Sequence, residues 1–289
     1  MILVVGSTGV LGGMIARLLL EQGLSVRILV RRGSSYAGLV ELGAEPIFGD
    51  LKEPDSLGAA CRGVDTLVTT ANSALRGGAD TVETVDRKGN RNLIDAARTA
   101  SVQHFIFVSA LGVSEESGMD FMRAKAETER YLRDSGMGYT ILQPNAFMDT
   151  WIPLLVSSAV QAGQPVTLVG EGRRRHSMIA AADVAAFTIA CAENKATLNR
   201  SIPLGGPEAV SWRDILAACE RALGHPLEVR RLALGESIPG LPDLVSQFAA
   251  ALESYDSPLE MAQTASALGV RLTPVDEFLT ELLAPAGRS

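Results

Sequence analysis

Short apolar runs and amphipathic stretches alternate along the first half of the chain. Residues 1–5 form an apolar, β-branched run, and a periodic apolar stretch from Val10 to Gln22 follows and closes at Gly23. The first pattern predicts a strand and the second a helix, because apolar positions recur at the helical spacing. A second apolar run at 24–30 arrives at the distance expected of a strand–helix–strand unit. The sequence therefore predicts a βαβ unit here.

The same alternation continues to residue 143. Further strands are predicted at 45–48, 65–70, 103–109 and 139–143, and helices at 36–42, 80–100 and 121–133. Asp80 and Glu83 suggest an N-cap pair for the long helix, and Gly89 lies on its packed face. Alternating strands and helices predict an α/β fold with a doubly wound parallel Rossmann sheet, whose ligands bind beyond the carboxyl ends of the strands.

The pattern loosens beyond about residue 150. The remaining pieces are helical stretches at 147–162, 182–193, 211–224 and within 240–283, and a short strand near 166–169. We therefore expect a Rossmann domain over 1–150. Over 151–289 we expect a smaller, mainly helical C-terminal lobe for substrate binding, interleaved with the sheet rather than independent. Interfaces between domains are common places for substrate selection.

Three glycines follow the first predicted strand with the spacing G-x-x-G-x-x-G. Gly6 permits a sharp turn, Gly9 lets the backbone approach a pyrophosphate, and Gly12 lets the helix pack close to the strand. The N-terminus of the helix then offers free N–H groups and a positive dipole end to the phosphates. We expect the nucleotide to contact the turn, and the alternative is a turn with only a structural role. The expected contact residues are Gly6, Ser7, Thr8, Gly9, Leu11 and Gly12.

The end of the second strand indicates which dinucleotide binds. An acid at this place usually binds the ribose hydroxyls of NAD, whereas an arginine accommodates the 2′-phosphate of NADP. Arg31 and Arg32 stand here and no acid is adjacent. Guanidinium groups bind phosphate through charge-assisted, often bidentate hydrogen bonds. We therefore expect NADP(H) rather than NAD(H), and the alternative is a solvated arginine pair.

Other strand ends supply further candidates for cofactor contacts. Asp50 could accept a hydrogen bond from the adenine amino group or could cap a helix starting near Pro54. The small residues after the fourth strand would let a ribose come near. The candidates from these positions are Asp50, Leu51, Ala71, Asn72, Ser73 and Pro144.

Composition limits the classes of function. The chain has 289 residues, 47% hydrophobic and 20% charged, and a net charge of −7 without a long basic run. Proteins that bind nucleic acid usually carry a basic patch, and this chain has none in its sequence, so we expect no nucleic-acid partner. No apolar run approaches the roughly 18 residues of a membrane span, so we expect a cytoplasmic protein without a membrane partner. Cys61, Cys191 and Cys219 are too few and too dispersed to suggest a disulfide framework or a metal site.

Taken together, these stretches resemble the NmrA-like family of atypical short-chain dehydrogenases. The resemblance covers most of the chain and rests on Gly6-x-x-Gly9-x-x-Gly12, Arg31, Gly49-Asp50, Gly89-Asn90-x-Asn92-Leu93, Phe107-Val-Ser109 with Gly112, Lys125, the stretch from Tyr139 to Met148, and Asp183-Val-Ala185. It implies cofactor contacts from Lys125, Asn145 and Phe147. The family contains NADPH-dependent reductases of quinones, triphenylmethane dyes and isoflavones, and also cofactor-binding regulators without turnover.

The catalytic candidates follow from this resemblance. Short-chain dehydrogenases generally place a tyrosine four residues before the active-site lysine, and here Phe121 stands four residues before Lys125. Lys125 either approaches the nicotinamide ribose or donates a proton, or it is a surface lysine paired with Glu129. Ser109 either acts in the site or caps its strand end. His176, in a basic loop, is the other acid–base candidate.

The sequence thus predicts an NADPH-dependent oxidoreductase that transfers hydride to a quinone-like or conjugated aromatic small molecule. Hydride transfer to such an acceptor needs little proton assistance, which suits a site without the tyrosine. The alternative is a non-catalytic, NADP(H)-sensing regulatory protein of the NmrA type. We expect a monomer or a homodimer.

Overall fold

The computed structural model describes residues 1–284, and residues 285–289 of the expected second lobe lie outside the described residues. The chain forms two compact units. Unit 1 contains residues 1–144, 184–203 and 268–270, and unit 2 contains the described remainder. Both units are therefore built from discontinuous stretches of the chain.

A parallel sheet is the centre of unit 1. Within residues 1–284 it has seven strands in the order β3-β2-β1-β4-β5-β6-β8. The strands are β1 (Ile2–Val5), β2 (Val26–Val30), β3 (Glu45–Phe48), β4 (Thr66–Thr69), β5 (His104–Val108), β6 (Gly138–Pro144) and β8 (Arg200–Leu204). All neighbouring pairs from β3 to β6 are parallel. The order reverses direction at β1 and β4, the place where ligands bind in such sheets.

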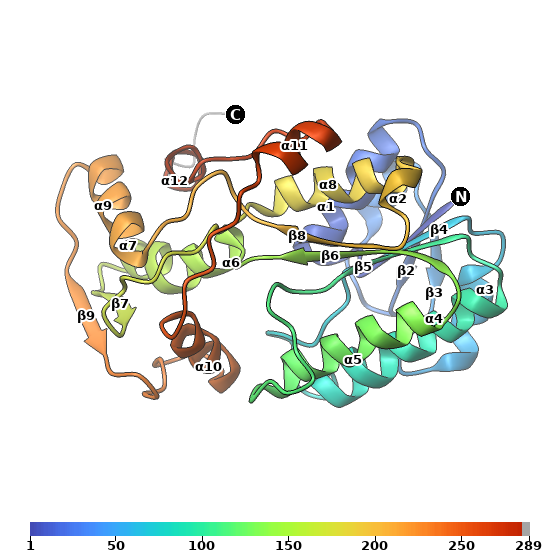
Figure 1. Cartoon of the computed structure of the whole chain (residues 1–289), viewed down its shortest axis with the longest axis horizontal. Coiled ribbons are helices and arrows are strands. Elements are labelled where there is room, and N and C mark those ends of the chain that lie inside the picture. The colour runs from blue at the N-terminus through green and yellow to red at the C-terminus, as the bar shows by residue number, and fades with distance from the viewer. Residues whose placement is uncertain (285–289) are drawn as a thin grey trace. The chain divides into compact units, whose positions relative to one another are not determined.

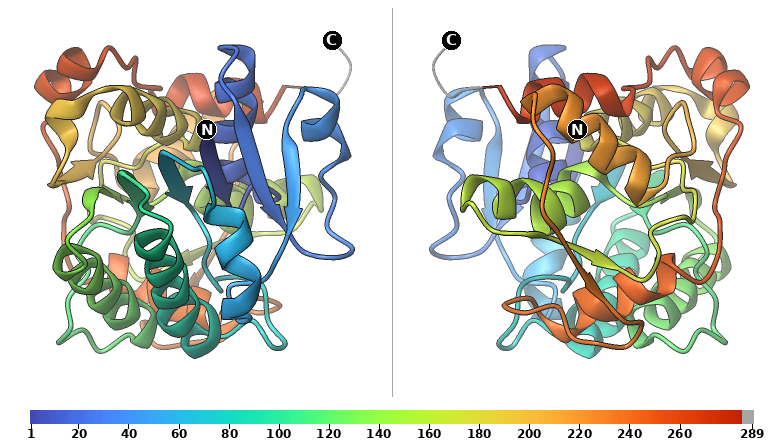
Figure 2. Two further views of the ribbon diagram at one scale, coloured as in Figure 1. Left: turned by 90° about the vertical axis from the view of Figure 1, so that its right-hand side faces the viewer. Right: turned by 90° about the vertical axis from the view of Figure 1, so that its left-hand side faces the viewer.

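Helices cover both faces of this sheet (Figure 1 and Figure 2). One face carries α1 (Val10–Glu21), and the other carries α4 (Asn90–Thr99) and α5 (Asp120–Asp134) side by side. Unit 1 also contains α2 (Ala37–Glu41), the 3-10 turn Pro54–Ser56, α3 (Leu57–Cys61), the 3-10 turn Lys195–Thr197 and most of α8 (Ala181–Glu193), which begins in unit 2. Leu3, Leu67 and Phe105 are fully buried between sheet and helices. Each such side chain contributes about 1.5–3 kcal/mol.

Unit 2 has its own hydrophobic core. A parallel pair, β7 (Val166–Val169) and β9 (Val229–Leu232), packs with helices around Met148, Trp151 and Ile215. The helices are α6 (Met148–Ile152), a π-helix (Pro153–Ser157), α7 (Ser158–Gln161), α9 (Trp212–Leu223), α10 (Asp243–Leu252), α11 (Ala262–Leu268, whose last residue belongs to unit 1) and α12 (Val275–Leu282). Among the described residues, no helix combines the length and the apolar character needed to cross a membrane.

The structure departs from the predicted elements in three places. Strands β8 and β9 were not predicted, because Pro203 and the charged residues of Val229–Leu232 hide their apolar periodicity. The long helix begins as a π-helix, Val82–Gly89, before α4. Its N-cap is Thr81, which exchanges side-chain and backbone hydrogen bonds with Thr84, so the predicted Asp80 cap is wrong. Helices with π geometry are rare and concentrate at functional sites.

The buried histidine of β5 makes the stability of the fold dependent on pH. His104 contacts Thr140 Oγ1 through Nε2 at 2.8 Å, and burial lowers its pKa from 6.5 to about 4. The folded state resists protonation, so stability is complete above pH 6.5 and falls as pH drops towards 4. We expect the free energy of unfolding to decrease by about 2–3 kcal/mol over this window. Urea unfolding at pH 7 and pH 4.5 measures it. A His104→Gln variant with the same loss would contradict the assignment.

Candidate functional site

The glycine turn between β1 and α1 has the geometry of a phosphate-binding loop. Gly6 has a φ of +87°, and a Cβ there would approach Thr70 Oγ1 to 2.6 Å. A Cβ at Gly12 would lie 2.2 Å from the carbonyl oxygen of Gly6, so only glycine fits. At Gly9 the corresponding Cβ would meet that oxygen at 3.4 Å, an ordinary contact. Gly6 and Gly12 are therefore required by the protein itself, whereas Gly9 is free of such a requirement.

Arg31 is held in a cluster of charged side chains that the sequence did not reveal. Its Nη1 lies 2.7 Å from Asp80 Oδ2 and 3.8 Å from Asp50 Oδ2. Lys52 Nζ also donates to Asp80, and Arg76 Nη1 approaches Asp80 to 4.0 Å. Burial opposes ionisation of Asp80, but hydrogen bonds from Lys52 and Arg31 hold its pKa below the usual value. An acid thus does reach Arg31, from a distant part of the sequence.

Asp50 takes part in this cluster and does not cap a helix. Its Oδ1 accepts from the backbone N–H of Lys52 at 2.9 Å. The 3-10 turn beginning at Pro54 has Glu53 at its N-cap and no side-chain cap. Of the two readings of Asp50, the capping one is therefore wrong. Arg32 lies apart from the cluster, with its guanidinium 5.7 Å from the ring centre of Phe48.

Lys125 is buried inside unit 1. Only 4% of the residue is exposed, and Nζ donates to the carbonyl oxygen of Val108 at 3.1 Å, at the carboxyl end of β5. The ammonium also lies 5.0 Å from the ring centre of Phe107 and 5.3 Å from that of Phe121. Because Lys125 is buried and Glu129 pairs with Arg133 at 2.6 Å, the interpretation of Lys125 as a surface lysine paired with Glu129 is wrong.

Burial lowers the pKa of Lys125, and the charges of Asp86 and Glu129 oppose this effect. Asp86 is 1% exposed, and burial raises its pKa against the charge of Lys125. One oxygen of Asp86, Oδ2, accepts from the backbone N–H of Ser73 at 3.0 Å, after β4. Lys125 and Asp86 thus lie at the ends of β5 and β4, and the charge of each favours the charged form of the other. Shifted pKa values of this kind are common at functional sites.

Asp86 was not recognised from the sequence. It stands on the packed face of the helical stretch, in step with Asn90 and Leu93, which are also buried. A carboxylate on the apolar face of an amphipathic helix was the available signal, because a buried charge needs a partner.

Several buried polar atoms at the strand ends have no partner among the described residues. They are Ser7 Oγ in the glycine turn, Ser109 Oγ after β5, Asp86 Oδ1 and Asn90 Oδ1. Buried polar atoms are normally hydrogen-bonded, so each such group needs an explanation. Ser7 and Ser109 were both predicted as site residues, and their free hydroxyls fit contacts with a bound dinucleotide.

The other predicted residues of unit 1 lie at the same strand ends. Asn72 Nδ2 donates to the carbonyl of Thr70, and Leu51 packs where a Cβ at Gly89 would stand. Pro144 accepts from the N–H of Leu111 through its carbonyl oxygen. Thr8 is exposed, Ala71 and Leu11 are half-buried, and Ser73 is buried.

The predicted residues of unit 2 are engaged within that unit. His176 is 3% exposed, with Nδ1 2.7 Å from Ser257 Oγ and Nε2 2.8 Å from the carbonyl oxygen of Leu252. Burial lowers its pKa. Asn145 Nδ2 donates to the carbonyl oxygen of Ser257 at 2.9 Å, and Phe147 is the N-cap of α6. This geometry favours a structural role for His176.

Comparison with known proteins identifies the family of the chain. A family model described as NAD(P)H-binding matches residues 6–195, which include the glycine turn, Arg31 and Lys125. The chain belongs to this NAD(P)H-binding family. This match confirms the nicotinamide cofactor inferred from the turn, and the structural neighbours share the doubly wound Rossmann fold.

Two relatives and one solved structure are similar to this chain. The photosystem II assembly factor Ycf39 of Cyanophora paradoxa is 36% identical over 81% of this chain and 72% of its own length. The NAD(P)H azoreductase of Xenophilus azovorans is 32% identical over 82% and 79%. The structure of the Escherichia coli NADPH-dependent quinone oxidoreductase QOR2 complexed with NADPH superposes with a TM-score of 0.82 at 21% identity, covering 98% of this chain and 99% of that one. Two of these three proteins are named as reductases that use NAD(P)H or NADPH, and one is named as an assembly factor.

Proposed function

We propose that the protein is an NADPH-dependent reductase of quinone-like or other conjugated acceptors. The observation that carries the proposal is the buried Lys125 at the end of β5, with its charge coupled to Asp86. Burying a charged group is unfavourable, so a lysine with only a structural role is expected at the surface rather than at this buried strand end. The azoreductase and the quinone oxidoreductase support the acceptor class, because both names describe reduction of conjugated systems.

A bound nicotinamide cofactor would supply the hydride, and the residues of this chain would hold it. The N–H groups of the glycine turn and the N-terminus of α1 would bind its pyrophosphate. Lys125 Nζ, fixed by the carbonyl oxygen of Val108, holds a proton for the cofactor ribose or for the reduced acceptor. Phe107 and Phe121 exclude water around the ammonium. Ser109 Oγ adds a buried donor at the same strand end.

The direct test is to mix the purified protein with NADPH and a panel of quinones, azo compounds and aromatic ketones. Loss of absorbance at the reduced-nicotinamide band, dependent on protein and acceptor, is the expected result. Binding of NADPH without turnover of any acceptor would contradict a reductase.

The choice between NADPH and NADH should depend on Arg31. We expect Arg31→Ala to weaken NADPH binding by about tenfold or more while changing NADH binding little, because a charged hydrogen bond to the 2′-phosphate is lost. Calorimetric titration with both cofactors measures the difference. Equal affinity of the unmodified protein for NADPH and NADH would exclude this role.

Asp80 should weaken binding of the 2′-phosphate of NADPH. Its carboxylate occupies the guanidinium of Arg31 and the ammonium of Lys52, so a 2′-phosphate competes with it for both cations. We expect Asp80→Asn to strengthen NADPH binding several-fold and to leave NADH binding nearly unchanged. The matched control is Asp95→Asn, which removes an exposed carboxylate elsewhere in unit 1. Weaker NADPH binding in Asp80→Asn would show that Asp80 positions Arg31 instead.

A second function is a cofactor-binding assembly or regulatory protein. The assembly factor Ycf39 is among the relatives, and phenylalanine replaces the tyrosine of ordinary short-chain dehydrogenases at Phe121. Such a protein binds NADPH and reduces no acceptor, so the acceptor panel separates the two functions.

A further inference from the structure

Unit 2 contains a pocket to which the proposed reduction assigns no residue. Its volume is about 1040 Å³. The lining residues come from the loop after β7, the end of β9 and the segment after α10, together with Ala209. The acids among them are Glu171, Glu253 and Asp256. All of the lining residues belong to unit 2. Four arginines face three acids here, in a chain whose net charge is −7.

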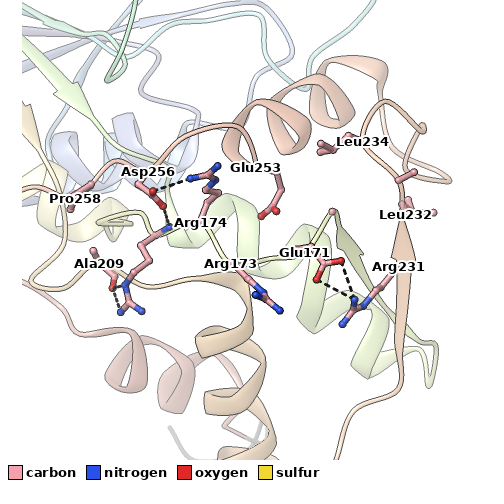
Figure 3. Close-up of a pocket in the computed structure, with 13 residues that line it drawn as sticks. Glu171, Arg173, Arg174, Ala209, Arg231, Leu232, Leu234, Glu253, Asp256 and Pro258 are labelled. Atoms are coloured by element: carbon pink, nitrogen blue, oxygen red, sulfur yellow. Dashed lines mark hydrogen bonds and ion pairs between the residues drawn. The ribbon is translucent and has the colours of Figure 1, made fainter.

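Three of the four arginines are already neutralised or bound. Arg174 pairs with Asp256 at 3.2 Å, and Arg231 pairs with Glu171 at 3.3 Å. Arg175 donates to the carbonyl oxygen of Ala209 and pairs with Asp214 at 3.2 Å. Among residues 1–284, Arg173 has neither an ion pair nor a hydrogen bond from its guanidinium. Figure 3 shows Arg173 between the Arg174–Asp256 and Glu171–Arg231 pairs, without a dashed line.

The backbone on both sides of Arg173 is fixed. The N–H of Gly172 donates to Glu253 Oε2 at 3.0 Å, and the N–H of Arg175 donates to Asp256 Oδ1 at 2.8 Å. Gly172 has a φ of +61°, and a Cβ there would lie 2.6 Å from Leu168 Cδ1. The loop therefore holds the base of the Arg173 side chain in place before any ligand arrives, which lowers the entropic penalty of binding.

The rest of the pocket is partly apolar. Leu232, Ala233 and Leu234 line one side, and Leu234 is 59% exposed although it is a large aliphatic residue. An unpaired guanidinium beside exposed apolar surface suits a ligand with an oxyanion and an apolar body, since arginine binds carboxylate, sulfonate and phosphate oxygens in a bidentate manner.

We propose that this pocket binds an organic anion, with Arg173 holding the oxyanion and Leu232 and Leu234 contacting the apolar part. Every residue of the site belongs to unit 2. Asp256, Glu171 and Asp214 pair with the other three arginines, and Glu253 accepts from the N–H of Gly172, so an oxyanion can bind Arg173 without displacing an ion pair.

Calorimetric titration of the full chain tests the proposal, with naphthalene-2-sulfonate and 2-naphthoate as probes. We expect both to bind at one site, and Arg173→Gln to weaken each by about tenfold or more. The matched control is Arg230→Gln, on the same strand as Arg231 but outside the pocket lining. Strand alternation points Arg230 and Arg231 to opposite faces, so the control should bind like the unmodified protein.

Further readouts keep the test decisive. Neutral 2-naphthol lacks the oxyanion and inorganic sulfate lacks the apolar body, so each should bind about tenfold more weakly than naphthalene-2-sulfonate. Arg173→Lys should recover part of the affinity. NADP⁺ affinity and the melting temperature should be the same in all variants, which separates this site from the dinucleotide site. Unchanged affinity in Arg173→Gln, or 2-naphthol binding as tightly as the sulfonate, would overturn the proposal.

Discussion

Gly9→Val is expected to lower dinucleotide affinity by more than about 10²-fold, or about 3 kcal/mol, while the melting curve changes little. Gly9 has φ −89° and ψ 168°, which valine adopts without strain, and its Cβ would make only an ordinary contact with the protein. The added side chain therefore meets the bound pyrophosphate rather than the fold. Fluorescence titration with NADPH and thermal unfolding of the same preparations measure both quantities.

Two other glycines provide the contrast for this experiment. Gly12→Ala should destabilise the fold as well as abolish binding, because its Cβ would lie 2.2 Å from the carbonyl oxygen of Gly6. Gly58→Ala should change neither, since a Cβ there meets nothing within 4 Å. A Gly9→Val protein that still binds NADPH tightly would place the phosphates elsewhere.

Lys125→Met is expected to lower acceptor reduction by about 10²-fold, the usual scale of acid–base and positioning effects. It should also destabilise unit 1, because the carboxylate of Asp86 loses the buried charge that stabilises it. Steady-state kinetics with NADPH and a quinone measure the first effect, and urea unfolding measures the second.

The controls separate chemistry from stability. Adding Asp86→Asn to Lys125→Met should recover stability without recovering turnover, because the unpaired carboxylate is removed while the proton donor is still missing. Lys88→Met removes an exposed lysine of the same region, whose side chain is 69% exposed, and should leave the rate unchanged. Phe121→Tyr should leave quinone reduction largely intact, because no proton transfer from that position limits the rate. A Lys125→Met enzyme as fast as the unmodified protein would remove this lysine from the mechanism and direct attention to Ser109.

Local sequence patterns predicted most of the fold. The alternation of β-branched runs and amphipathic stretches located the strands and helices from β1 to β6, because those periodicities follow from backbone geometry alone. The glycine spacing predicted the turn for the same reason, since Gly6 and Gly12 are required by local backbone contacts. β8 and β9 were missed because their pairing partners, not their own side chains, make them strands.

Long-range contacts decided the site. The sequence placed arginines after β2, but only the folded chain brings Asp80 to Arg31, across 49 residues. It offered Lys125 as either a surface or a site residue, and the packing of α5 on the sheet buries it beside Phe107 and near the charge of Asp86. Burial and charge pairing depend on residues far apart in the chain. They were therefore decided by the tertiary structure, whereas the sequence alone determined the glycine turn and the order of the elements from β1 to β6.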